Sequence, residues 1–306
     1  MNSSTPTAPV APDESGSWVG GLALTLAGSR RYALFRPADA AVGERLPLMV
    51  MLHGCGQDAA GFAASTGMNA LAARHRFMVL YPEQSTLYNP NGCWNWFCTA
   101  SGRAYAEVEI IVNAIDQVSR LYGADPQRIV IGGLSAGASM AALVATRHPE
   151  LFKAVVMHSG VPPGTATCGL SALDAMRGQA ATPPIDAYAG LARRLPPLLA
   201  IHGMDDDVVA PSNSRAAAGA WAAAAGAVAG EPRTARPARR YAARITAFAG
   251  SPLATATLVE IDGLGHAWSG GDAREPFGDD AGPDASVMMW CFARRASRAA
   301  RAELAD

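Results

Sequence analysis

Residues 129–140 read Ile129-Val-Ile-Gly-Gly-Leu-Ser-Ala-Gly-Ala-Ser-Met140. The β-branched run at 129–131 predicts a strand, and the alanine-rich segment that follows the glycines predicts a helix. In a strand–turn–helix context, Gly-x-Ser-x-Gly is a nucleophile elbow, a sharp turn that holds its serine in a strained backbone conformation. Glycines two residues to either side leave room for such a turn. The stretch therefore predicts Ser135 as a nucleophile, with the backbone N–H of Ala136 available to stabilise an oxyanion.

The overall composition is that of a large globular domain. The chain has 306 residues, half of them hydrophobic, and a net charge of −1. The near-neutral charge argues against nucleic acid or an anionic membrane as the main partner, and no apolar run is long enough to span a bilayer. Residues 1–17 are polar and rich in Pro, Ser and Thr, which predicts a disordered arm without the features of a signal peptide. By default this indicates a cytoplasmic protein.

Predicted strands alternate with predicted helices along the rest of the chain. Strands are expected at 22–25, 31–35, 46–52, 77–81, 129–131, 154–157, 198–202 and 257–261, and helices at 68–75, 108–122, 138–147, 212–228 and 284–298. This alternation predicts an α/β protein with a mostly parallel, doubly wound sheet and helices on both faces. We expect one catalytic domain over 18–298, a candidate cap or lid at 164–195, a basic loop of no assigned role at 230–240, and a tail at 299–306.

The predicted nucleophile needs a histidine as base and a carboxylate to orient that histidine, and in this fold they follow in the order Ser, Asp/Glu, His. Four histidines come after Ser135. Helix capping explains His148, while His158 and His202 end strands; His158 is suited to lining a cleft and His202 to packing. His266 lies in a glycine-rich loop after the last predicted strand, which can carry the imidazole back over the serine. We predict His266 as the base.

The carboxylate is expected between these two residues, at the carboxyl end of a strand. Three consecutive aspartates, 205–207, follow the strand predicted at 198–202. Asp206 fits the H-G-x-x-D-x-x-V pattern that is common in hydrolases, and it is the predicted acid. Its neighbours Asp205 and Asp207 are interpreted as solvated or loop-capping residues.

A second oxyanion donor is expected in the turn after the strand at 46–52. His53-Gly54-Cys55 occupies this turn, so the backbone N–H of Cys55 is the candidate. Cys55 as a nucleophile is the alternative, but a disulfide to Cys93 or a packed thiol is the plainer interpretation. The five cysteines (55, 93, 98, 168 and 291) leave at least one unpaired, and no Cys/His cluster has zinc-ligand spacing. We expect no metal site.

Five motifs together resemble the polyhydroxybutyrate depolymerase family of esterases, a group that also includes feruloyl and acetylxylan esterases. They are Leu52-His-Gly-Cys-Gly-Gln57, Tyr81-Pro-Glu-Gln84, Asn89-Pro-Asn-Gly-Cys-Trp-Asn-Trp-Phe97, Gly133-Leu-Ser-Ala-Gly-Ala-Ser-Met140 and Gly265-His-Ala-Trp268. The resemblance covers roughly residues 30 to 292. It implies an α/β-hydrolase fold, a triad of Ser135, Asp206 and His266, and hydrolysis of carboxylic esters without a cofactor. Members of the family are often secreted, with a signal peptide and a polymer-binding domain; neither is recognisable in this sequence, so we expect little action on crystalline polymer.

Aromatic residues near these motifs suggest a substrate-binding surface. We predict substrate contacts for Gln57, Trp94, Trp96 and Trp268, since apolar rings beside a few polar groups suit an ester ligand. Core packing is the commoner role of such large side chains. The expected function is hydrolysis of a hydroxyalkanoate polyester or oligomer, with a feruloyl or acetylxylan esterase as the alternative. A non-catalytic binding protein of the same fold is disfavoured, because all three triad residues are present in order.

Overall fold

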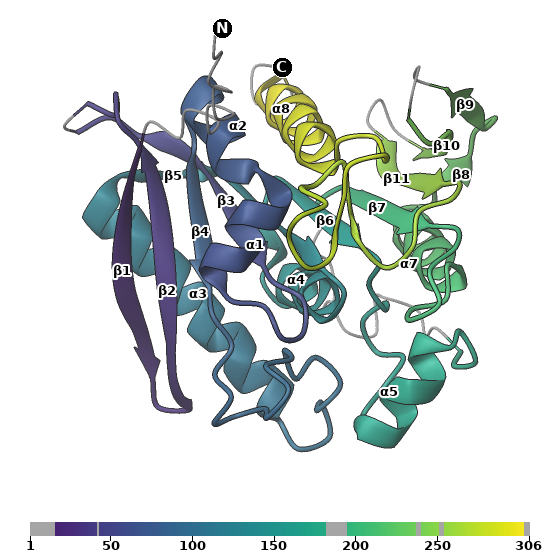
Figure 1. The fold of residues 1–306 in the computed structure, drawn as a ribbon, viewed down its shortest axis with the longest axis horizontal. Coiled ribbons are helices and arrows are strands. Elements are labelled where there is room, and N and C mark those ends of the chain that lie inside the picture. The colour runs from purple at the N-terminus through teal and green to yellow at the C-terminus, as the bar shows by residue number, and fades with distance from the viewer. Residues whose placement is uncertain (1–15, 42, 182–194, 237–239, 251–253, 303–306) are drawn as a thin grey trace, which may run out of the picture.

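The computed structural model describes residues 16–41, 43–181, 195–236, 240–250 and 254–302. Their main feature is one large twisted sheet (Figure 1). In spatial order its strands are β1 (Gly16–Thr25), β2 (Gly28–Pro37), β4 (Met78–Pro82), β3 (Leu46–Leu52), β5 (Ala124–Leu134), β6 (Ala154–His158), β7 (Leu198–Gly203), β11 (Ala254–Ile261), β10 (Ala243–Ala249) and β8 (Val228–Ala229), with β9 (Arg233–Ala235) also beside β10. The strands from β4 to β11 are parallel, and the outer ones are antiparallel.

Helices cover both faces of the sheet, as the continuous apolar strands predict. Leu48, Val50 and Leu52 of β3 pack with helices α3 (Arg103–Tyr122), α4 (Ala136–Arg147) and α7 (Ser212–Ala224). The alternate residues Met49 and Met51 pack on the other face with α1 (Ala59–Thr66), α2 (Met68–His75) and α8 (Ala285–Ala302). The result is a three-layer α/β-hydrolase fold, in which Figure 1 views the sheet from the side of α1, α2 and α8.

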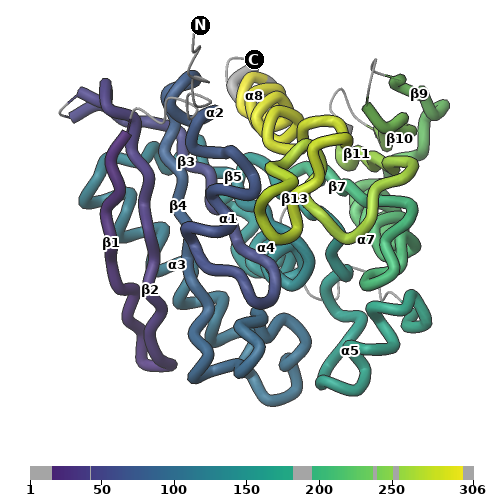
Figure 2. Tube along the Cα trace, viewed as in Figure 1, coloured from purple at the N-terminus to yellow at the C-terminus, as the bar shows by residue number. Residues whose placement is uncertain are grey.

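The parallel strands end at the same edge of the sheet. In the strand register, Leu52 lies opposite Gly133, Leu134 opposite His158, and His158 opposite Ile201. The loops that follow these strands therefore meet. The irregular segment after β4 and helix α5 (Gly169–Met176) lie at this same end of the molecule, at the bottom of Figures 1 and 2. In open α/β sheets this edge is where ligands bind.

Most predicted elements are present, but several boundaries were wrong. Strand β1 begins at Gly16, so the last two residues assigned to the N-terminal arm belong to the sheet, and α8 extends to Ala302, well into the predicted tail. The helix predicted at 212–228 ends at Ala224, where the chain turns into β8.

Other elements were not predicted at all. They are α1, α5, β8, β9, β10 and the two-residue strands β12 (Trp268–Ser269) and β13 (Gly278–Asp279). Strand β9 lies within the predicted basic loop at 230–240. Much of the predicted cap, residues 182–194, lies outside the described part of the chain. None of the described helices has the length and apolarity needed to cross a membrane.

Candidate active site

Ser135 occupies a strained turn between β5 and α4. Its φ is 56° and its ψ is −120°, a conformation that L-residues rarely adopt. The flanking glycines are required by close backbone approach: a Cβ at Gly133 would lie 2.3 Å from the carbonyl oxygen of Leu52, and one at Gly137 would lie 2.0 Å from the same atom. The Ser135 N–H donates to the carbonyl of His158 at 2.9 Å, which anchors the turn to β6. This is the nucleophile elbow that the motif predicts.

Asp206 and His266 come together 60 residues apart in the sequence. The Nδ1 of His266 lies 2.8 Å from Oδ2 of Asp206. The carboxylate follows β7 and is fully buried, while the imidazole is carried by the loop after β11. An ionised carboxylate only accepts hydrogen bonds, so Nδ1 of His266 carries the proton and Nε2 keeps its lone pair. This is the tautomer that a general base needs.

The Asp206 carboxylate has donors on both oxygens. Oδ1 accepts from the backbone N–H groups of Val208, at 3.0 Å, and Val209, at 2.8 Å. Oδ2 faces His266 and also Nε2 of His202, at 3.2 Å. Burial raises the pKa of Asp206, but the hydrogen bonds from His202, His266 and Val209 outweigh burial and hold this pKa well below its usual range. Asp206 is therefore an anion at neutral pH. The contribution of His202 was not expected from sequence, where this residue was assigned only to packing.

His158 links the serine to the histidine loop. Its carbonyl binds the Ser135 N–H, and its ring nitrogen Nε2 accepts from the N–H of Ser269, at 3.1 Å. Ser269 lies three residues after His266, so the elbow after β5 and the histidine loop are both held by the buried His158, one through its backbone carbonyl and the other through its ring.

The buried ring of His158 makes stability depend on pH. Burial, helped by the nearby His202 and His266, lowers the pKa of His158 from 6.5 to about 3. Between these values the unfolded chain binds one more proton than the folded chain, so the free energy of unfolding must fall as the pH drops below 6.5. At pH 5 this single group is expected to lower the free energy of unfolding by about 2 kcal/mol.

Urea unfolding of the wild type and of His158→Gln at pH 7 and pH 5 would measure this cost. The glutamine does not titrate, and its amide oxygen can replace Nε2 as the acceptor for Ser269. We expect the variant to lose about 2 kcal/mol less than the wild type over this interval. Equal losses in the two proteins would show that His158 does not carry the effect. Asp206 does not interfere, because its contribution is lost only below about pH 4.

The two backbone N–H groups that the sequence predicts as oxyanion donors lie at neighbouring strand ends. Ala136 begins α4, where the first N–H groups have no partner in the helix, and Cys55 follows β3 in the adjacent loop. Within the described residues, neither N–H donates to another protein group. Residues Leu52 and Gly133 face each other across β3 and β5, so the two donors extend from neighbouring strand ends.

His53 fixes the peptide that carries the Cys55 donor. Its Nε2 accepts from the N–H of Gln84, at 3.0 Å, so the proton lies on Nδ1, which donates to the carbonyl of Gly54 at 2.8 Å. Burial lowers the pKa of His53, which keeps the ring neutral. The C=O and N–H of a trans peptide point in opposite directions. Holding the Gly54 carbonyl against His53 therefore aims the Cys55 N–H away from the buried ring.

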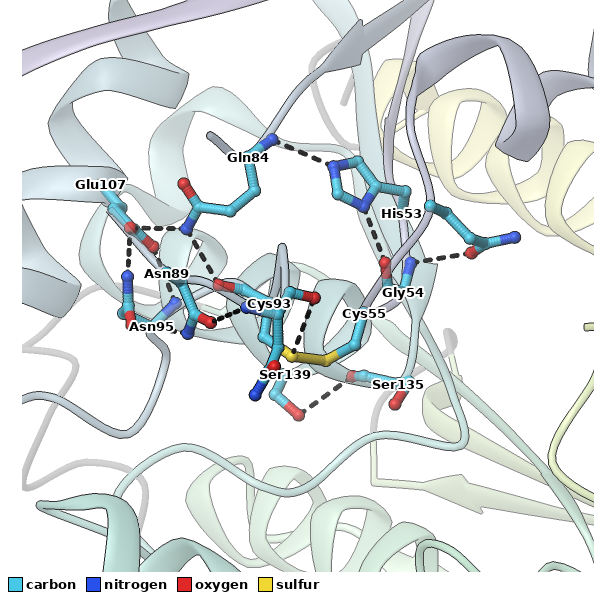
Figure 3. The surroundings of a disulfide bond; sticks show 12 residues. His53, Gly54, Cys55, Gln84, Asn89, Cys93, Asn95, Glu107, Ser135 and Ser139 are labelled. Atoms are coloured by element: carbon cyan, nitrogen blue, oxygen red, sulfur yellow. Dashed lines mark hydrogen bonds between the residues drawn. A yellow bond between two sulfur atoms is a disulfide. The ribbon is translucent and has the colours of Figure 1, made fainter. Parts of the chain in front are cut away.

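A disulfide and a buried polar network support the same loop (Figure 3). Cys55 is bonded to Cys93, so it has no thiol, and the alternative that Cys55 is the nucleophile is wrong. Gln84 donates to the Cys93 carbonyl at 3.0 Å and to Glu107 at 2.7 Å. Glu107 is buried and pairs with the equally buried Arg30 at 2.8 Å. Through Cys93 and Gln84 the oxyanion loop is thus linked to one buried ion pair, which no local sequence pattern indicates.

The predicted substrate-binding tryptophans do not fit that role. Trp94 and Trp268 have no exposed surface; Trp268 stacks on His158 and donates to the hydroxyl of Ser286. Trp96 is only 8% exposed. These rings pack in the core, the commoner role of large apolar side chains, and are not exposed to a substrate. Gln57 is half-buried, and its amide bridges the Gly54 N–H and the carbonyl of Pro276, so in this structure it closes the oxyanion loop.

The described residues contain no group of three or more His, Cys, Asp or Glu side chains that is suited to holding a metal ion. What they bring together is a serine on a strained elbow, a buried Asp–His pair and two backbone donors. On a sheet of this order they define an α/β-hydrolase.

The chain belongs to the esterase PHB depolymerase family, whose model matches residues 30–241. It is 35% identical to poly(3-hydroxyalkanoate) depolymerase C of Paucimonas lemoignei, over 59% of this chain and 45% of that protein. It is 28% identical to acetylxylan esterase A of Aspergillus oryzae, over 57% of this chain and 61% of that enzyme, and 28% identical to feruloyl esterase B of Neurospora crassa, over 57% and 63%. The matches span between 45% and 63% of the length of these relatives.

The fold is shared with solved esterases. An acetyl xylan esterase from Aspergillus awamori superposes with a TM-score of 0.66 at 22% sequence identity, over 82% of this chain and 94% of that one. Esterase PE8 superposes with a TM-score of 0.56 at 19% identity, over 86% and 96%. At these identities the likeness shows the common α/β-hydrolase fold.

Proposed function

We propose that this protein is a serine carboxylesterase that cleaves esters of hydroxyalkanoates, as polyester segments or oligomers, through an acyl-enzyme. The observation that supports the proposal most is the 2.8 Å hydrogen bond between Asp206 and His266, in a chain whose Ser135 is held in the elbow conformation. Membership of the esterase family supports ester bonds as the target. The higher identity to a poly(3-hydroxyalkanoate) depolymerase than to the carbohydrate esterases favours the hydroxyalkanoate substrate.

Each group has one role in this mechanism. Ser135 attacks the ester carbonyl while Nε2 of His266 takes its proton, and the oxyanion that forms is stabilised by the N–H groups of Ala136 and Cys55. His266 then protonates the leaving alcohol, and the acyl-enzyme remains. In the second half, His266 activates water for attack on this intermediate, and Asp206 stabilises the imidazolium throughout.

A feruloyl or acetylxylan esterase is the second candidate, because relatives with those activities share 28% identity over a similar length of chain. Initial rates on a soluble 3-hydroxybutyrate oligomer, methyl ferulate and an acetylated xylo-oligosaccharide separate the two. We expect the largest kcat/KM on the oligomer. A preference for methyl ferulate or the acetylated sugar would reassign the substrate, and no hydrolysis of any ester would contradict the esterase itself.

A further inference from the structure

Phe277 has an unusual backbone for an aromatic residue. Its φ is 61°, a value that bulky L-residues rarely adopt, yet its side chain is 42% exposed. Core packing therefore does not explain the strained conformation. Among non-glycine residues of the described chain, positive φ also occurs at Arg76, Ser135 and Ser159. Ser135 is the proposed nucleophile, and strained residues of this kind cluster at functional sites.

Hydrogen bonds hold the backbone at Phe277 between the histidine loop and the oxyanion loop. Its carbonyl accepts from the N–H of Trp268 at 2.7 Å, two residues beyond His266. The carbonyl of the preceding Pro276 accepts from Gln57 at 3.3 Å, in the oxyanion loop. Neither bond uses the phenyl ring. The backbone is thus fixed to the histidine loop on one side and to the oxyanion loop on the other, and the ring is left at the surface.

The ring lies against the proposed base. The centroids of Phe277 and His266 are 6.4 Å apart, and the ring planes are nearly perpendicular, at 87°. In acyl transfer the histidine delivers its proton to the leaving alcohol, so a group beside its imidazole faces the alcohol part of the ester rather than the acyl part. An exposed phenyl ring at this point offers an apolar surface for that part.

We propose that Phe277 binds the alcohol portion of the substrate and makes the enzyme prefer esters whose alcohol carries an aromatic or branched apolar group. The inference rests on the proposed esterase function and extends it to the leaving-group side. In a hydroxyalkanoate chain, the alcohol portion is the next unit with its alkyl branch, which is a group of this kind.

The test varies alcohol and acyl group independently. One series holds the acyl group constant in methyl, isobutyl and benzyl acetate; the other holds the alcohol constant in methyl acetate, butyrate and hexanoate. For Phe277→Ala we expect the ratio of kcat/KM for benzyl over methyl acetate to fall about tenfold, the usual value of an aromatic contact. Any loss on methyl acetate should be smaller than the loss on benzyl acetate, and the order of preference among the methyl esters should not change.

Three further variants separate the ring from the backbone. Phe277→Gly also removes the ring but relieves the strained φ; it should match Phe277→Ala in substrate ratio. Phe277→Tyr should keep the wild-type ratio. Leu121→Ala, at a side chain 68% exposed near the end of α3, is the control for loss of surface apolar area and should change nothing.

Specific outcomes would overturn the inference. Equal losses on methyl and benzyl acetate in Phe277→Ala would mean that the ring supports His266 and does not bind the alcohol. An altered order in the methyl-ester series would place Phe277 on the acyl side. A wild type that hydrolyses none of the five esters but reacts with a fluorophosphonate probe would contradict the proposed specificity, and one that also fails to react with the probe would contradict the proposed function.

Discussion

Replacing Ser135 with Ala is expected to lower kcat about a millionfold on every ester that the wild type hydrolyses. The hydroxyl oxygen is the atom that forms the acyl bond, and no other nucleophilic side chain is proposed in the site. The substitution should not unfold the protein, because the turn is held by backbone groups, the Ser135 N–H on the His158 carbonyl and the flanking glycines against Leu52, and alanine keeps all of them. Initial rates on p-nitrophenyl acetate, with urea unfolding in parallel, measure both quantities.

The matched control is Ser119→Ala. Its hydroxyl is half-buried in α3 and donates to the carbonyl of Ile115 at 2.8 Å, so the control also removes one serine hydroxyl. Ser119 lies near the end of α3 that leads into the start of β5, whereas the elbow follows the other end of this strand. Ser119→Ala should keep full activity and full labelling by a fluorophosphonate probe, whereas Ser135→Ala should lose the label. A Ser135→Ala protein that retained even 1% of wild-type kcat would contradict the acyl-enzyme mechanism.

Local sequence signals account for the centre of the fold. The elbow is specified within a dozen residues, because a strand, a turn with two obligatory glycines and a helix follow one another directly. The central strands can be predicted because helices cover both of their faces, so that their residues form continuous apolar runs. Strand β10 shows the limit: it lies near the edge of the sheet and reads Ala243-Arg-Ile-Thr-Ala-Phe-Ala249, with mixed burial, so neither a buried run nor a clean alternation marks it.

The residues of the site also divide into those that sequence signals indicated and those that they did not. The order Ser, Asp, His that the fold requires along the chain made Ser135, Asp206 and His266 candidates, and the structure places Asp206 and His266 in contact. The substrate contacts of the aromatic residues could not be predicted, because composition does not say which way a loop residue faces. Trp268 and Phe277 both adjoin His266, yet the first is fully buried and the second is exposed.

The buried polar network that supports the oxyanion loop could not be predicted from the sequence either. Arg30 and Glu107 pair across 77 residues, and no local pattern joins them. The ion pair supports the oxyanion loop through Gln84, which contacts both Glu107 and the carbonyl of Cys93. Such contacts depend on tertiary packing rather than on motif spacing.

Asp206→Asn is expected to lower kcat about ten-thousandfold while leaving the fold intact. The reason lies in the hydrogen bonds of the two carboxylate oxygens. Val208 and Val209 both present backbone N–H donors to Oδ1, so the oxygen of an asparagine amide must take that position and its NH₂ group must face His266. Nδ1 of His266 then has to accept, the proton moves to Nε2, and the imidazole can no longer take a proton from Ser135.

The neighbouring aspartates supply a close control. Asp205→Asn and Asp207→Asn each remove one negative charge beside the site, but both side chains are exposed and neither binds His266, so each variant should stay within about threefold of wild-type kcat. The comparison distinguishes the effect of orienting the imidazole from the electrostatic effect of a nearby negative charge. KM for p-nitrophenyl acetate should change little in all three proteins, since the tautomer of His266 governs proton transfer and not ground-state binding. If Asp205→Asn or Asp207→Asn lost as much activity as Asp206→Asn, the acid of the triad would have to be reassigned.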